Sequence, residues 1–176
     1  MAIGAALEKW HDFYVLLGTG AAALVALLFV AVSLGAGFLT EERAEATRTF
    51  FSPVVVHFGA VFFLACIALV PDHRADFFAA VIGVTALAGL GVSAYTTVMF
   101  FGRYRTPYWT DHFAYVVLPI LAYVALLAAM GLAYARHSEA LDVMAGALLL
   151  LLLVNVRNAW DLMLSMVRRH VEPPQQ

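Results

Sequence analysis

The feature that most constrains this chain is a series of long apolar runs that are almost free of charge. The first run covers residues 13–39 and contains no charged side chain. A helix needs about 20 predominantly apolar residues to cross the hydrocarbon core of a bilayer, whereas the apolar core of a signal peptide has only about 7 to 15. We therefore interpret this run as a transmembrane helix that the protein retains.

Four later runs repeat the pattern, and charged residues or prolines separate them. They cover residues 50–70, 77–101, 112–134 and 140–166. The breaks between them are short, so neighbouring helices should pack antiparallel. The sequence predicts an all-α, polytopic membrane bundle of about five transmembrane helices, which forms a single domain over residues 1–176.

Composition supports a bilayer as the main partner of this chain. Hydrophobic residues make up 64% and charged residues 12% of the sequence, and the mean hydropathy is +0.88. Soluble domains carry about 25% charged residues. Five spans nearly use up 176 residues, which leaves no separate soluble domain. The formal net charge of −2 gives no electrostatic reason to bind nucleic acid.

The distribution of basic residues predicts how the chain is oriented. Apart from Arg157, three basic residues flank one side of the predicted spans, namely Lys9, Arg74 and Arg136. Six flank the other side, namely Arg43, Arg48, Arg103, Arg105, Arg168 and Arg169. Positive residues are enriched in cytoplasmic loops, so the C-terminus should be cytoplasmic and the N-terminus outside. The alanine-rich composition suggests a bacterium, and hence a multi-pass protein of the cell inner membrane.

Polar side chains inside the fifth run are the main functional signal. Asn155, Arg157, Asn158 and Asp161 interrupt a stretch that is otherwise apolar. An ionisable group at mid-span costs about 2.5–3.5 kcal/mol on insertion scales, so it needs a protein, water or ligand partner. At about 100° per residue, the last three side chains share one face, and Arg157 and Asp161 form an i, i+4 pair.

The antiparallel topology brings further polar residues to the same end. His57 near the start of the second run, and Asp111 and His112 at the start of the fourth, should lie at the depth of this polar face. The predicted lining of a polar layer in the cytoplasmic half is therefore His57, Asn155, Arg157, Asn158, Asp161, Asp111 and His112.

Two interpretations of this layer stay open. In the structural one, Arg157 and Asp161 neutralise each other while the amides and His57 join helices by hydrogen bonds. In the functional one, the layer lines a water-accessible pocket, with His57 as a proton-sensitive element. The several donors of the Arg157 guanidinium favour water, phosphate or an anionic group nearby.

No motif supports enzymatic chemistry, and no cofactor is expected. Cys66 is the single cysteine, and we expect it to be a small buried apolar side chain. G-x-S-x-G, P-loop and G-x-G-x-x-G patterns are missing, and no span contains a lysine for retinal. A haem between His57 and His112, zinc on these two with Asp111, or a pigment or quinone on the many aromatic residues are the weaker alternatives.

Small residues and prolines predict how the helices pack and bend. Gly18, Ala22 and Ala26 follow one another at i, i+4 and i+8, a spacing that allows close helix contacts. Gly89 and Ser93 repeat this spacing in the third run, and we expect both sets to pack within one protomer. Ser52 followed by Pro53 favours a helix start, whereas Pro119 inside the fourth run should kink that helix.

Two segments resemble a known group of proteins. The opening Asp12-Phe13-Tyr14-Val15-Leu16-Leu17-Gly18-Thr19, with Phe29-Val30-Ala31-Val32-Ser33-Leu34, and the closing Asn155-Val156-Arg157-Asn158-Ala159-Trp160-Asp161-Leu162 look like uncharacterised small bacterial five-helix membrane proteins. The resemblance implies a five-helix fold and carries no activity, substrate or site residue.

Two functions follow as hypotheses. The first is a homo-oligomeric channel or transporter that passes or binds a small solute or ion through the polar layer. The second is an accessory or assembly subunit of a larger respiratory or photosynthetic membrane complex, which the lack of a soluble domain or catalytic motif favours.

Overall fold

The computed structural model of this chain describes residues 3–35, 41–71, 74–102 and 113–171, and they are almost entirely helical. The helices are α1 (Ile3–Gly35), α2 (Glu41–Ala68), α3 (Ala75–Gly102), the π-helical turn η2 (Phe113–Val117), α5 (Leu118–Tyr134) and α6 (Glu139–Val171). Within these ranges there is no β-strand. The predicted all-α class is confirmed.

Four segments are long and apolar enough to cross a membrane, which makes this a multi-pass membrane protein. They are Leu7–Ala31, Ala75–Met99, Phe113–Tyr134 and Glu139–Asp161. The apolar part of α2, Pro53–Ala68, is shorter. The first helix also begins well before the predicted run, because helical hydrogen bonding continues through the charged residues at 8, 9 and 12.

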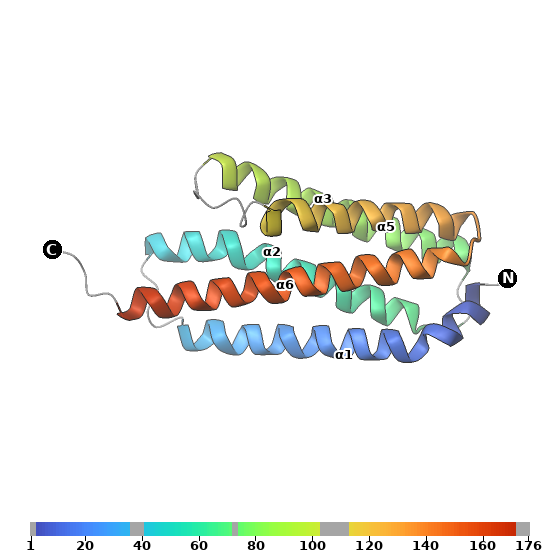
Figure 1. Cartoon of the computed structure of the whole chain (residues 1–176), viewed down its shortest axis with the longest axis horizontal. Helices are drawn as coiled ribbons and strands as arrows, with labels where there is room; N and C mark the ends of the chain where they lie inside the picture. Colours follow the sequence, from blue (N-terminus) through green and yellow to red (C-terminus); the bar gives the residue numbers. More distant parts are fainter. Residues whose placement is uncertain (1–2, 36–40, 72–73, 103–112, 172–176) are drawn as a thin grey trace.

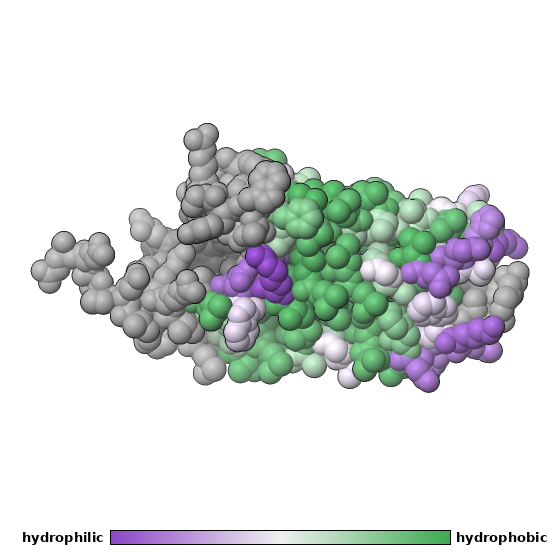
Figure 2. All heavy atoms as spheres, viewed as in Figure 1, coloured by the Kyte–Doolittle hydropathy of each residue, from purple (hydrophilic) through white to green (hydrophobic). Residues whose placement is uncertain are grey.

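The helices lie side by side along one axis, and α6 occupies the middle of the bundle (Figure 1). α6 packs against α5, α2 and α1, while α3 packs mainly against α5 and α2. Figure 2 shows an apolar band around the centre of the molecule and hydrophilic residues toward its two ends. Large apolar side chains such as Leu16, Phe29 and Val84 are exposed, as lipid-facing residues are expected to be.

Close contacts between helices occur at two of the predicted small residues. A Cβ atom added at Gly18 would lie 3.1 Å from the Cβ of Ala65 in α2, and one added at Gly89 would overlap the ring of Tyr123 in α5. The prediction for Ala22 and Ala26 is wrong, because both are exposed. Each step of four residues rotates about 40° further around a helix, so these positions turn away from the buried face.

The prolines lie differently from the prediction. α2 begins at Glu41, so Pro53 is inside a helix rather than at its start. Pro119 lies in the first turn of α5, where a missing amide hydrogen is tolerated, and the irregularity comes just before it, in η2. The fourth predicted run is therefore a π turn followed by an α-helix, and Pro119 marks the change.

Candidate functional site

The Arg157–Asp161 pair lies on the surface of α6. Arg157 Nη2 and Asp161 Oδ2 are 3.4 Å apart, and their side chains are 42% and 38% exposed. The predicted i, i+4 ion pair is present, but the predicted single polar face divides into an exposed and a buried part. Asn158, on the same arc, is 2% exposed.

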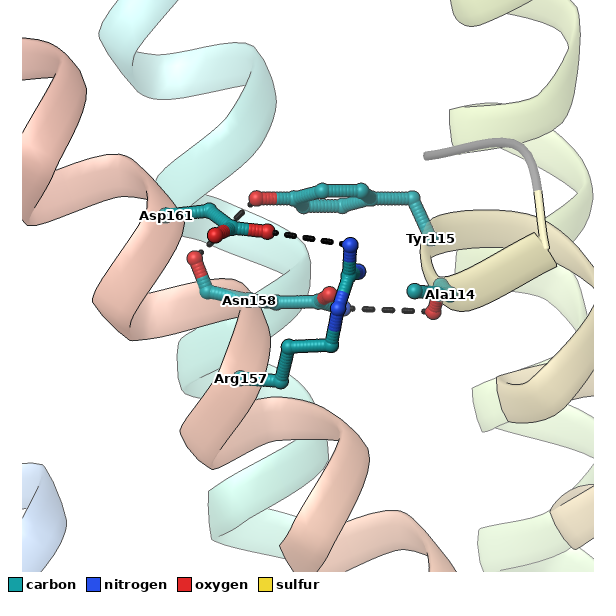
Figure 3. A network of polar contacts seen from close by, with 5 residues as sticks. All are labelled: Ala114, Tyr115, Arg157, Asn158 and Asp161. Atoms are coloured by element: carbon teal, nitrogen blue, oxygen red, sulfur yellow. Dashed lines mark hydrogen bonds and ion pairs between the residues drawn. The ribbon is translucent and has the colours of Figure 1, made fainter. Parts of the chain in front are cut away.

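Asn158 joins α6 to η2 through two hydrogen bonds. Its side-chain Nδ2 donates to the carbonyl oxygen of Ala114 at 3.3 Å, and the hydroxyl of Tyr115 donates to the Asn158 carbonyl oxygen at 3.0 Å. Figure 3 shows the side chains of Arg157, Asn158 and Asp161 extending from α6 toward the turn that carries Ala114 and Tyr115. A side chain and a backbone group of one residue thus hold the two elements together.

The π turn and Pro119 explain why Ala114 needs this donor. In a π turn the amide of residue i+5 donates to the carbonyl of residue i. The corresponding donor for Ala114 would be residue 119, which is a proline and has no N–H. Ala114 is buried, and leaving such a carbonyl unpaired costs about 1–3 kcal/mol. The Asn158 amide supplies the donor that Pro119 lacks.

His57 and Tyr123 form the second polar contact of the interior. His57 Nδ1 and the Tyr123 hydroxyl are 2.7 Å apart, and both side chains are buried. Gly89 of α3 leaves the space that the Tyr123 ring fills. This contact therefore depends on α2, α3 and α5 at once.

The packing of α2 on α6 places His57 near the level of Asn155. Val54 and Phe58, on either side of His57 along α2, form a small cluster against which Leu152 and Ala159 of α6 pack. Asn155 lies between those two α6 residues and is fully buried. The structure thus brings His57, Asn155 and Asn158 to one layer of the bundle, and Arg157 and Asp161 lie at its edge.

Hydroxyl groups of α3 near this end are occupied within their own helix. Ser93 Oγ donates to the Gly89 carbonyl at 2.8 Å, and Thr96 Oγ1 donates to the Val92 carbonyl at 2.9 Å. Both residues are buried. Their hydroxyls are therefore paired within α3. The hydrogen bonds between helices at this end come from the histidine, the tyrosines and the asparagines.

The remaining predicted residues do not add to this site. Asp111 and His112 lie outside the described residues, and so do the haem and zinc sets that the sequence offered as weaker alternatives, since each of them includes His112. Within that part, no group of three or more His, Cys, Asp or Glu side chains has an arrangement suited to a metal ion. Cys66 is exposed, which contradicts the expected buried position.

Sequence reasoning missed Tyr123, Tyr115 and the Ala114 carbonyl. A signal for Tyr123 was present, because a phenol in the middle of an apolar run needs a hydrogen-bond partner. Tyr115 follows the same rule at the start of its run. The Ala114 carbonyl has no signature in side-chain composition, since its need for a donor arises only from the π turn.

Comparisons of this chain with protein-family models, with curated proteins and with solved structures found no match.

Proposed function

We propose that this chain is a small multi-pass protein of the cell inner membrane that forms a homo-oligomer and binds or passes a small polar solute or ion. The observation that carries the proposal is the layer of buried polar side chains that α2, α5 and α6 contribute toward one end of a bundle whose interior is mostly apolar. Buried polar groups in a membrane are costly, and such groups commonly mark solute and ion pathways.

The side chains on the two sides of the layer differ, and the difference supports a site that opens toward one end of the bundle. The Arg157–Asp161 pair is partly exposed and lies at the outer edge of the layer. Toward the other end of the bundle the interior is filled by apolar side chains, including Met144, Leu148 and Phe78. By the distribution of basic residues the polar end faces the cytoplasm. A solute would therefore bind from that side, and its passage would require the apolar half to open.

Flux measurements in liposomes test this proposal. The purified protein would be reconstituted and the fluxes of ammonium, sodium, potassium, chloride and neutral polar solutes compared with those of protein-free liposomes. We expect one of them to be raised, and we expect Asn155→Leu with Asn158→Leu to lower that flux at least about tenfold.

Gly91→Ala serves as the matched control, because nothing lies within 4 Å of a Cβ atom at that position. Fluxes equal to those of protein-free liposomes for every solute would contradict transport. Native mass spectrometry of the protein extracted from its own membranes adds the oligomeric state. A complex with other proteins there would overturn the homo-oligomer and favour an accessory subunit.

A further inference from the structure

The polar layer contains two buried acceptor atoms that no described residue satisfies. Asn155 and Asn158 are 0% and 2% exposed, and their Oδ1 atoms have no hydrogen-bond partner among the described residues. Each unpaired buried polar atom costs about 1–3 kcal/mol. These two are therefore a feature that needs an explanation beyond helix packing.

The hydrogen bonds of the amide nitrogens fix which atom is free. Asn155 Nδ2 donates to the Leu151 carbonyl at 2.9 Å, and Asn158 Nδ2 donates to the Ala114 carbonyl at 3.3 Å. Exchanging nitrogen and oxygen in either side chain would set two oxygen acceptors against each other. The free atom is consequently a carbonyl oxygen in both residues.

The two oxygens belong to neighbouring positions on one face of α6. Residues three apart on a helix differ by about 60° around the axis and about 4.5 Å along it. Both oxygens therefore belong to side chains less than one turn apart on the buried part of α6. The neighbouring part of α2 packs here through Val54 and Phe58, against which Leu152 and Ala159 of α6 lie, and the buried His57 precedes Phe58 in the chain.

The charges at the edge of the layer favour a hydrogen-bond donor over an anion. The Arg157 guanidinium is paired with the Asp161 carboxylate at 3.4 Å, so the nearest cation on α6 has its charge balanced. The unsatisfied atoms themselves are acceptors only. An anion would meet two carbonyl oxygens, whereas an N–H or O–H group would meet the partners it needs.

We infer that the carboxamide oxygens of Asn155 and Asn158 form a buried binding site for a small hydrogen-bond donor, either an internal water molecule or an ammonium-type solute. This inference names the ligand class of the proposed function. The ammonium-type solute rests on that function, whereas an internal water molecule does not. It also replaces the anionic group that the guanidinium of Arg157 suggests from sequence alone.

An isotope label can report on this site selectively, because Asn155 and Asn158 are the only asparagines in the chain. Protein grown with asparagine carrying ¹³C at the side-chain carbonyl would be reconstituted in bilayers and studied by solid-state NMR. Ammonium chloride would be titrated against tetramethylammonium chloride, which has the same charge and no N–H donor. Sodium formate against sodium chloride would test anions.

The two sources give different results. An ammonium-type ligand predicts that both carbonyl signals shift with ammonium in a saturable manner and do not shift with tetramethylammonium. Internal water predicts that both signals receive magnetisation from water protons without added ligand. Signals that show neither behaviour, or that shift with formate, would overturn the inference.

Variants separate this site from the transport proposal. Asn158→Leu should weaken the ammonium response of the Asn155 signal about tenfold, the loss of about one hydrogen bond. Because Asn158 also holds η2, Asn155→Leu provides the second variant, with the Asn158 signal as its readout. A response of the carbonyl signals without flux in liposomes would support the site and reject transport. Flux without any response of these signals would support transport and reject the site.

Discussion

At the level of single residues, a few atoms decide whether the interior contacts form. Tyr123 is fully buried in a part of the bundle that lipid surrounds, and its hydroxyl meets His57 Nδ1 at 2.7 Å. The ring fits only because residue 89 has no side chain. His57 was recognisable from sequence as a polar group in an apolar run, whereas the importance of Gly89 depends on which ring faces it.

Gly89→Ala should destabilise the bundle by about 1–3 kcal/mol, because the new methyl group would overlap the Tyr123 ring in a packed interior. Thermal unfolding in detergent measures this difference. Gly91→Ala, two residues further along α3, places its methyl group in open space and should leave stability unchanged or slightly raised. Equal effects of the two substitutions would show that the ring does not lie against Gly89.

Tyr123→Phe should also lower stability by about 1–3 kcal/mol, since it removes the hydroxyl that pairs with the buried His57 ring. Tyr95→Phe is the matched control, because Tyr95 is exposed on α3. Chemical denaturation in mixed micelles would compare the two. If Tyr123→Phe were no more costly than Tyr95→Phe, the buried hydrogen bond would contribute nothing.

At the level of elements, the apolar runs predicted where the helices lie, because a helix in a bilayer needs a long segment of apolar side chains, which the sequence shows directly. The ends were predicted less well. α1 begins at Ile3 and includes the charged residues before position 13, and α2 begins at Glu41 instead of at Pro53. Both helices start earlier than predicted because backbone hydrogen bonds do not require apolar side chains. η2 was missed, because a π turn is a backbone register that only Pro119, five residues after Ala114, indicates.

A double-mutant cycle should show that Pro119 and Asn158 depend on each other. Asn158→Leu alone leaves the Ala114 carbonyl without its side-chain donor and should cost about 1–3 kcal/mol. In a Pro119→Ala background residue 119 has an amide that can donate instead, so the same substitution should cost less. The expected coupling energy is about 0.5–3 kcal/mol by equilibrium unfolding.

Additive effects in this cycle would contradict the account of η2. Ser93→Ala offers a control for loss of a local side-chain bond, because the Ser93 hydroxyl donates to the Gly89 carbonyl of its own helix. It should show no coupling with Pro119→Ala.

At the level of the whole molecule, α6 in the centre of the bundle carries the polar residues into contact with α2 and α5. The one-sided placement of the polar layer followed from the antiparallel order of the runs, which sequence alone predicted. The internal arrangement of the layer could not be predicted in the same way. Asn158 is buried and Arg157 is partly exposed because of how α6 is rotated about its own axis. Sequence periodicity predicts that rotation only to within about one residue step of 100°.

The position of α2 matters most for this account, because its apolar part, Pro53–Ala68, is the shortest and carries His57. Cys66 is the only cysteine and is exposed on α2, so a nitroxide can be attached there without any mutation. Electron paramagnetic resonance in bilayers would then compare collisions of the label with oxygen and with a water-soluble nickel chelate. If α2 crosses the membrane, oxygen access will be high and nickel access low. High nickel access with low oxygen access would place Cys66 in water and would contradict an α2 that lies in the bilayer through Ala68.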